Sequence, residues 1–338
     1  MAHHDLIVIG ASAGGVEALK QLVSGFPVDL PAAILIVLHV SPHGTSVLPN
    51  ILSRAGKLKA VHPLDGQAIE RGRIYVAPPD YHLIVKTGYV AVARGPSENG
   101  HRPAVDPLFR SAARTYDGRV IGVILSGALD DGTAGLQAIK SRGGIAVCQD
   151  PADALHSSMP QSAMDAVGVD YSVPIAQMAE LLVRLVHDPV DEEGNTNMPS
   201  NLDQESDIAE GNPLPPLGSP SGFACPECGG ALWEIHDHEL VRFRCRVGHA
   251  FSAQTLLAQQ SDALEDAFWV ALRALEESAA LARRMAERAR HSDRQLMAQR
   301  YDEQARDADQ RAEIVRSVLL NTSMRTDLDA GSTLGQKD

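Results

Sequence analysis

The chain has 338 residues and a net charge of −13 at neutral pH, since 43 acidic residues outweigh 30 Lys and Arg. This balance argues against a nucleic-acid-binding protein, which needs clustered basic side chains to neutralise phosphates. No apolar run reaches the roughly 20 residues of a membrane span and we identify no secretory signal, so we expect a cytoplasmic protein without membrane insertion.

Residues 1–187 alternate short apolar runs with amphipathic stretches. Ile34–Leu38 is apolar at every position, which predicts a strand buried on both faces, as in a parallel sheet covered by helices. The predicted strands are Asp5–Ile9, Ala33–Val40, Arg73–Val76, Val120–Leu125 and Ile145–Cys148, and the predicted helices are Val16–Gly25, Ser46–Ser53, Asp106–Tyr116, Thr133–Ser141 and Ile175–His187. Leu83–Ala93 alternates and predicts an edge hairpin with Ile74–Ala77. We therefore predict an α/β domain with a doubly wound, mainly parallel sheet.

Ser12 lies in the glycine-rich turn between the first predicted strand and the first predicted helix. Such a turn exposes a small serine side chain, and the backbone amides of Ala13, Gly14 and Gly15 can face a developing oxyanion. The run partly matches the dinucleotide-binding pattern G-x-G-x-x-G, but Ser12 replaces the second glycine, where the backbone must approach a pyrophosphate. The turn therefore favours a hydrolase nucleophile over a cofactor site.

His39 ends the second predicted strand, and Asp131 follows the strand Val120–Leu125. The carboxyl ends of neighbouring parallel strands share one crevice, so Ser12, His39 and Asp131 can meet there as nucleophile, base and orienting acid. Each residue alone is more often an ordinary turn or loop residue. Their joint occurrence at three strand ends favours a catalytic triad.

The composition changes at residues 188–222, which hold many acids, several Pro and Gly, and no Lys or Arg. This stretch predicts a disordered, self-repelling linker. A small unit follows at residues 223–256, with predicted hairpin strands at Ala231–Ile235 and Leu240–Arg244.

Cysteines concentrate in this small unit. Cys225 and Cys228 form a C-x₂-C pair, and Cys245 and His249 form a C-x₃-H pair sixteen residues later. Two such pairs are typical of a tetrahedral Zn²⁺ site, and four protein ligands make it structural rather than catalytic. His236 and His238 are alternative ligands in the middle of the loop. We predict a zinc-ribbon-like unit that needs metal to fold.

Residues 257–321 predict a helical hairpin, because apolar residues recur at three- and four-residue spacing in two successive stretches. The first seam comprises Leu257, Leu264, Phe268, Leu275, Ala279, Ala282 and Ala286, and the second Met297, Tyr301, Ala305, Ala308, Ala312, Val315 and Leu319. Ser292 or Asp293 can cap the second helix. The hairpin can fold on itself, or it can self-associate or dock on helical partners. Residues 322–338 predict a disordered tail.

Residues 5–187 resemble the catalytic domain of the chemotaxis protein-glutamate methylesterases, the CheB family. The stretches that carry the resemblance are Ile7–Gly15, Val37–Val40, Ile74–His82, Arg102–Asp106, Leu125–Gly132 and Ser158–Pro160, in order and at compatible spacing. The resemblance implies a triad of Ser12, His39 and Asp131. It favours Asp131 over Asp130, because the family's acid directly precedes a glycine, here Gly132. We expect no cofactor in the reacting centre.

The implied substrate is the γ-methyl ester of glutamate on the cytoplasmic helices of chemoreceptors, or on a related signalling protein, with release of methanol. Some family members also deamidate glutamine. We expect Arg102 to line the cleft and meet acidic receptor side chains, or to form a plain surface salt bridge. Ala13 and Ala128 depart from the Thr and Met common in the family, which alters the pocket wall. The alternative is a non-catalytic signalling scaffold that binds partners through its zinc and helical regions.

Family enzymes usually carry an N-terminal receiver domain that blocks the cleft until it is phosphorylated. The nucleophile turn begins here at Gly10, so we expect no receiver domain ahead of it. Activity is then either constitutive or gated by the C-terminal region, and phosphodonors should leave it unchanged.

Overall fold

The computed structural model describes residues 3–190, 200–212, 217–237 and 240–331. The chain divides into two units, Met1–Leu257 and Ala258–Asp338. No helix in these ranges is both long enough and apolar enough to cross a membrane.

A seven-stranded sheet forms the centre of the first unit, in the order β10-β9-β8-β1-β2-β5-β3. The strands are β1 (Leu6–Ala11), β2 (Ala33–Leu38), β3 (Lys59–Val61), β5 (Arg73–Val76), β8 (Val120–Ile124), β9 (Ile145–Gln149) and β10 (Tyr171–Val173), and all of their pairings are parallel. Every residue of β1 and β2 is buried, which explains why these runs show no alternation. The predicted parallel sheet is confirmed.

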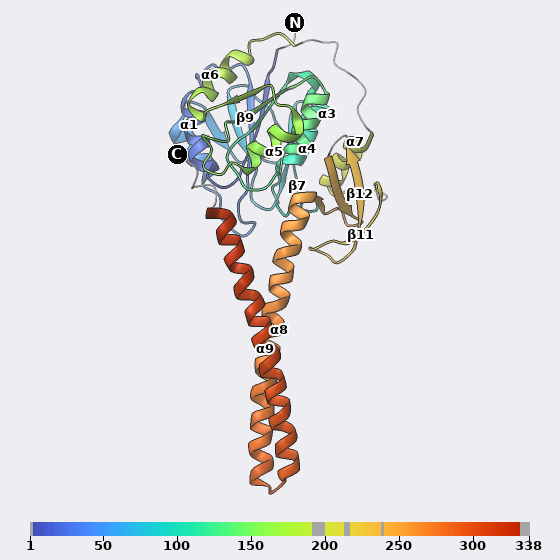
Figure 1. Ribbon diagram of the computed structural model, residues 1–338. Helices are drawn as coiled ribbons and strands as arrows, with labels where there is room; N and C mark the ends of the chain where they lie inside the picture. Colours follow the sequence, from blue (N-terminus) through green and yellow to red (C-terminus); the bar gives the residue numbers. More distant parts are fainter. Residues whose placement is uncertain (1–2, 191–199, 213–216, 238–239, 332–338) are drawn as a thin grey trace. The chain divides into compact units, whose positions relative to one another are not determined.

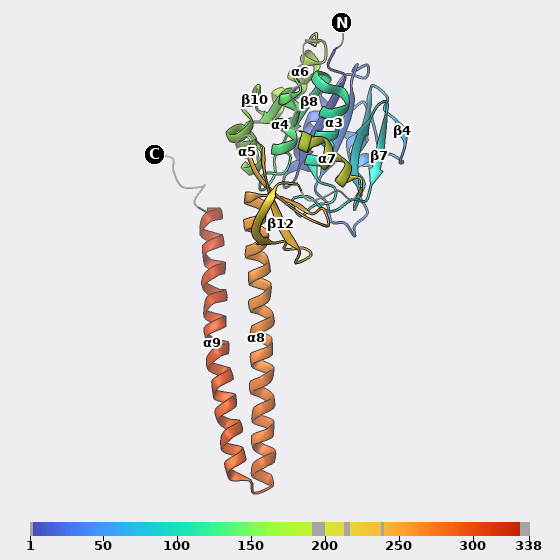
Figure 2. The same ribbon diagram turned by 90° about the vertical axis from the view of Figure 1, so that its right-hand side faces the viewer.

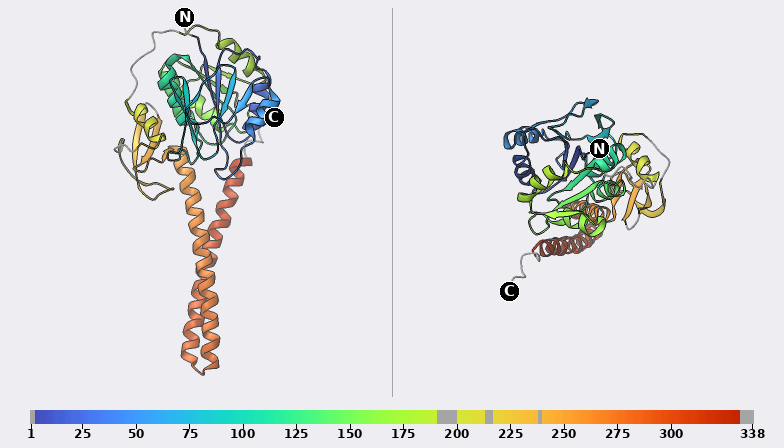
Figure 3. Two further views of the ribbon diagram at one scale, coloured as in Figure 1. Left: turned by 180° about the vertical axis from the view of Figure 1, so that it is seen from behind. Right: turned by 90° about the horizontal axis from the view of Figure 1, so that it is seen from above.

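Helices cover both faces of this sheet (Figure 1). One apolar core packs the sheet against α1 (Gly15–Ser24), α2 (Leu48–Ala55) and α6 (Ile175–Leu185). The opposite core packs it against α3 (Val105–Tyr116), α4 (Thr133–Ser141) and α5 (Ser158–Val167). Figure 3 shows the same sheet from behind and from above. The doubly wound α/β fold is therefore confirmed, with β3, α5 and β10 as elements that the sequence pattern did not predict.

The predicted edge hairpin forms, but it belongs to a different sheet. The strands β6 (His82–Lys86) and β7 (Tyr89–Ala93) pair with each other and with β4 (Gln67–Ala68) in a separate three-stranded sheet. The prediction that this hairpin pairs with Ile74–Ala77 was wrong, because β5 lies between β2 and β3 and has both edges occupied.

The cysteine-bearing segment forms a four-stranded antiparallel sheet of β11 (Ser219–Ala224), β12 (Ala231–Asp237), β13 (Leu240–Cys245) and β14 (Ala250–Ser252). The helix α7 (Ser200–Ala209) packs against α3, although it lies in the segment predicted to be a disordered linker. Glu205 of α7 is fully buried between Arg242 and Arg244. Local composition could not reveal these partners, which lie more than thirty residues away.

The second unit is a helical hairpin. It consists of α8 (Ala253–His291) from Ala258 onward and α9 (Gln295–Gly331), and the two helices lie side by side (Figure 2). Its seam buries small residues such as Ala279 and Ala312 beside Leu272. Three residues of the predicted seams are exposed, so their assignment to the seams was wrong: Leu257, Leu264 and Met297. The helix α9 begins at Gln295, so Arg294 rather than Ser292 or Asp293 directly precedes it, and Asp293 adopts a left-handed conformation between the two helices. The helix also extends past the predicted end at residue 321, and residues 332–338 of the predicted tail lie outside the described residues.

Candidate active site and metal cluster

Three predicted residues meet at the carboxyl ends of adjacent strands. Ser12 follows β1, His39 follows β2 on one side of it, and Asp131 lies in the loop after β8 on the other side. Backbone bonds tie these ends together, since the Ser12 amide donates to Ser126 O at 3.0 Å and the His39 amide donates to Ala11 O at 3.2 Å. The sheet order changes direction at β1, which is where open α/β sheets place their sites.

A hydrogen-bonded chain joins these three side chains. His39 Nδ1 lies 3.1 Å from Ser12 Oγ, and His39 Nε2 lies 2.7 Å from Asp131 Oδ2. The ionised carboxylate can only accept, so Nε2 carries the proton of the neutral imidazole, and Nδ1 is left with a lone pair facing the hydroxyl. This arrangement can deprotonate Ser12 and stabilise the resulting imidazolium.

Asp131 is a buried carboxylate with several donors. Besides His39, the amide of Val105 donates to Oδ2 at 2.7 Å, while Asn99 Nδ2 and the amide of Asp106 donate to Oδ1 at 2.9 and 3.3 Å. Burial alone would raise the pKa of Asp131, but the bonds from His39, Val105 and Asn99 outweigh it and hold the pKa well below its usual range. The group therefore stays charged beside the imidazole.

The sequence analysis did not identify three residues that lie beside the hydrogen-bonded side chains of Ser12, His39 and Asp131. The His101 ring stacks on His39 with centroids 3.7 Å apart, and burial together with the neighbouring His39 lowers its pKa to about 4. Asn99 lies between two buried carboxylates, those of Asp131 and Asp106. Burial and the Asp131 charge raise the pKa of Asp106 to about 7. Neither periodicity nor motif spacing marks these residues as part of the site, because Asn99 and His101 lie in the segment before α3 and Asp106 lies in the first turn of that helix.

The turn after Ser12 contains the predicted oxyanion donors. Gly14 has a φ of 75°, a conformation that suits glycine. The amide of Gly15 donates to Ser12 O at 2.9 Å and is therefore engaged within the turn. Among the described residues, none accepts a hydrogen bond from the backbone N–H of Ala13 or Gly14, so these two amides remain the candidate donors to an oxyanion.

Arg102 and Ala128 were predicted to line the cleft. Ala128 is exposed in the loop before Asp131. Arg102 donates from Nε and Nη2 to Asp80 Oδ1 at 2.9 and 2.6 Å, and from Nη1 to Gly95 O at 2.8 Å. Its guanidinium is thus held by protein partners, as in the salt-bridge alternative.

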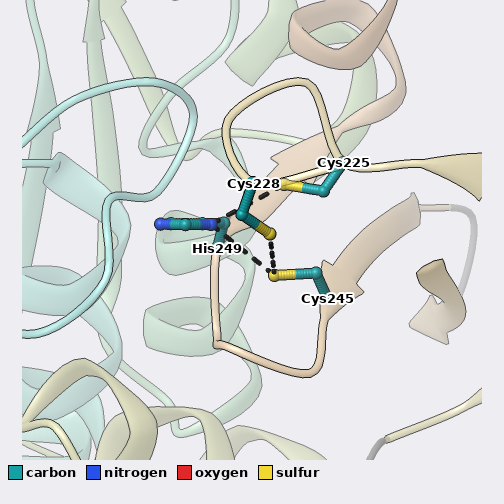
Figure 4. Close-up of side chains that lie close together, drawn as sticks. All are labelled: Cys225, Cys228, Cys245 and His249. Atoms are coloured by element: carbon teal, nitrogen blue, oxygen red, sulfur yellow. Dashed lines mark hydrogen bonds between the residues drawn. The ribbon is translucent and has the colours of Figure 1, made fainter. Parts of the chain in front are cut away.

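Cys225, Cys228, Cys245 and His249 lie together at the predicted metal site (Figure 4). Their ligand atoms all lie within 4.8 Å of one another. Cys228 Sγ lies 3.7 Å from Cys245 Sγ, and His249 Nδ1 lies 3.6 Å from the sulfurs of Cys225 and Cys245. In a tetrahedral site with Zn–S of about 2.3 Å and Zn–N of about 2.1 Å, two sulfurs lie about 3.8 Å apart and sulfur and nitrogen about 3.6 Å apart. The residues therefore fit a Zn²⁺ ion.

Backbone and carboxylate contacts support this cluster. The amide of Gly248 donates to Cys245 O, and Glu227 Oε2 lies 3.4 Å from His249 Nε2, the ring nitrogen that faces away from the sulfurs. A carboxylate on the second nitrogen of a ligating histidine fixes the ring and raises its basicity. His236 faces Glu234 on β12, and His238 lies outside the described residues.

A hydrogen-bonded Ser–His–Asp chain at the ends of parallel strands is the arrangement that defines serine hydrolases of the α/β class. Residues 7–182 match the family model described as CheB methylesterase, which is about half of the chain. The chain belongs to this family.

Similar proteins cover the same part of the chain. A protein of Leptospira interrogans is 39% identical over 184 residues, which are 54% of this chain and 95% of that protein. The "protein-glutamate methylesterase/protein-glutamine glutaminase 2" of Methanosarcina mazei is 37% identical over 190 residues, and the match spans 52% of its length. The solved CheB methylesterase catalytic domain of Thermotoga maritima matches with a TM-score of 0.53 and 32% identity, over 55% of this chain and all of that one. The Cys/His unit and the helical hairpin lie outside the residues of the family match.

Proposed function

We propose that the protein is a serine esterase that hydrolyses glutamate γ-methyl esters on the cytoplasmic helices of chemoreceptors or a related signalling protein. The single observation that carries the proposal is the chain of hydrogen bonds from Ser12 through His39 to Asp131. Membership of the methylesterase family supports the substrate class.

The mechanism follows from the atoms that face one another. Ser12 Oγ attacks the ester carbonyl while His39 Nδ1 takes its proton, and Asp131 stabilises the imidazolium through Nε2. The amides of Ala13 and Gly14 stabilise the oxyanion at the start of α1. The imidazolium then protonates the departing methoxide, and a water activated by His39 hydrolyses the acyl-enzyme to glutamate.

Methanol release from methylated receptor membranes tests this function. Wild type is expected to release methanol, whereas Ser12→Ala is expected to lose the activity by several orders of magnitude. Ser24→Ala, which removes an exposed hydroxyl at the end of α1, is the matched control. Equal release by wild type and Ser12→Ala would instead favour the non-catalytic scaffold. Ammonium release from receptors with glutamine at the same sites tests deamidation in the same samples.

We further propose that Cys225, Cys228, Cys245 and His249 hold a structural Zn²⁺. The donor set and its separations support this assignment, since four protein ligands leave no open position. Metal analysis of the purified full-length chain is expected to give one zinc per chain, and Cys228→Ala should abolish it. A fully folded Cys/His unit in chelator would contradict the proposal.

The helical hairpin supports a role in association. Trp269, Val270, Leu281 and Ile314 are large apolar residues exposed on its surface. Exposed apolar patches are typical of contact sites. We propose that they serve self-association or docking on receptor helices, and sedimentation with and without receptor fragments separates these outcomes.

A further inference from the structure

The strand β14 of the Cys/His unit lies against the loop that carries Asn99. Glu98 and Ala250 form a parallel bridge, the Asn99 amide donates to Ala250 O at 2.7 Å, and the Ala250 amide donates to Ser97 O at 3.3 Å. The loop of residues 97–99 thus pairs with β14 through an isolated bridge. These contacts come from sequence positions about 150 residues apart.

Hydrogen bonds at both ends of its amide group fix the side chain of Asn99 in one orientation. Its Nδ2 donates to Asp131 Oδ1 at 2.9 Å and to Asp106 Oδ2 at 3.1 Å, and its Oδ1 accepts from the Ser252 amide at 2.9 Å. Rotating the amide by half a turn would place its oxygen against two carboxylates and its NH₂ against a donor. The Ser252 amide on β14 therefore fixes the direction in which Asn99 presents its N–H groups to Asp131.

A second contact reaches the neighbour of Asp131. Ser252 Oγ and Thr255 Oγ1 donate to Asp130 Oδ1 at 2.7 and 3.0 Å. The Cys/His unit and the first turn of α8 thus hold the Asp130–Asp131 loop at two points, one through Asn99 and one through Asp130.

The same loop is tied to the four metal-ligating residues. Ser97 Oγ donates to Glu227 Oε1 at 2.6 Å, and Glu227 faces the ring of His249. Arg244, which precedes Cys245, donates to Gly248 O at 2.7 Å and to Glu98 Oε1 at 3.0 Å. Because Ser97, Glu98 and Asn99 are consecutive, a shift of the metal-binding turns moves the residue that orients Asp131.

We propose that Asn99 is a positioning residue for Asp131, and that the metal-bearing Cys/His unit holds it in place, so that esterase activity depends on that unit. This inference rests on the proposed function of Ser12, His39 and Asp131. The Cys/His unit is then a structural part of the esterase site, and loss of the metal lowers the esterase activity.

Asn99→Ala in the full chain is the direct test. Removing one hydrogen bond to a charged group is expected to lower kcat by about ten- to hundred-fold with little change in KM. Loss of the amide dipole leaves more negative charge on Asp131, so the lower limb of the pH–rate profile should move to higher pH. A merely structural role would not move that limb. Asn50→Ala, which removes an exposed amide on α2, is the matched control.

Two further full-length samples keep the proposal falsifiable if Asn99→Ala folds poorly. Ser252→Ala keeps its amide bond to Asn99 and should lose less activity than Asn99→Ala. Chelator-treated wild type should lose activity to the same extent as Asn99→Ala, regain it with Zn²⁺, and keep the far-ultraviolet circular dichroism of the α/β domain.

An NMR measurement separates failure of this inference from failure of the proposed function. The ring protons and pKa of His39 are recorded without substrate, in wild type, Asn99→Ala and the chelated protein. Changes in the two altered samples support the positioning role even if no methyl ester is hydrolysed. Unchanged His39 signals, or full activity of the chelated protein, would overturn it.

Discussion

Replacing Asp131 with Asn tests the proposed triad most sharply. Each carboxylate oxygen accepts two hydrogen bonds, so an amide NH₂ placed on either side faces two donors. When the NH₂ lies on the Oδ2 side it faces His39 Nε2, and the imidazole avoids this donor–donor contact by moving its proton to Nδ1, where it no longer accepts the proton of Ser12. The variant therefore loses the general base as well as the negative charge.

The separation of the two groups sets the magnitude. A charge pair at the 2.7 Å that joins His39 Nε2 to Asp131 Oδ2 is worth about 6 kcal/mol at an effective dielectric of about 20. Part of this is recovered by the amide dipole, so we expect kcat to fall by about 10³–10⁴-fold, or about 4–5.5 kcal/mol. KM should change little, because Asp131 is buried and does not contact the substrate.

Methanol release across pH 5–9 measures this effect, with Asp130→Asn as the matched control. Asp130 bonds Ser252 and Thr255 rather than His39, so its variant should stay within about tenfold of wild type. Asp131→Asn also removes the charge that raises the pKa of Asp106, which should fall from about 7. An Asp131→Asn enzyme within tenfold of wild type, or an equal loss in both variants, would refute the triad.

Three further substitutions test packing and charge. His101→Phe keeps the stack on His39 but removes a group whose pKa in the folded protein is lowered to about 4. As pH falls from 6.5 to 4, the free energy of unfolding of wild type should fall by about 2–3 kcal/mol relative to that of the variant. A difference in urea unfolding that stays constant with pH would contradict this. Glu205→Ala removes a buried carboxylate shared by three buried arginines, which leaves Arg110 and Arg244 with Glu98 and Arg242 with Asp237. It should cost about 3–5 kcal/mol in denaturant unfolding, against less than about 1 kcal/mol for the exposed Glu17→Ala. Gly14→Ala should lower the free energy of unfolding by about 1–3 kcal/mol and lower kcat. The φ of Gly14 is 75°, and an added Cβ would lie 2.8 Å from Ser126 Oγ. An unchanged melting temperature would show that the turn adjusts without strain.

The parallel sheet and its helices could be predicted from local patterns. Unalternated apolar runs marked β1 and β2, and the helix α4 was predicted at its observed bounds. A strand that is buried on both faces has an apolar side chain at nearly every position, so it can be predicted from its own residues alone. The position of the β6–β7 hairpin could not be predicted in this way, because strand pairing depends on which edges other strands have already occupied.

The predicted site residues were found for a similar reason. Ser12, His39 and Asp131 each stand directly after a strand or in the loop that follows it, so the rule for parallel sheets brings them to one edge. His101, Asn99 and Asp106 do not follow a strand in this way. Asn99 and His101 lie in the segment before α3 and Asp106 lies in its first turn, so only the fold brings them to the site.

By itself, the sequence determined most elements of the α/β domain, the sheet type, the three candidate catalytic residues and the four candidate metal ligands, because periodicity and ligand spacing are local properties of the chain. Only the tertiary structure decided that the supposed linker carries a helix and that β14 holds Asn99 against Asp131. Those contacts join residues about 30 to 150 positions apart, and buried charges such as Glu205 are stable only beside partners that the fold brings to them.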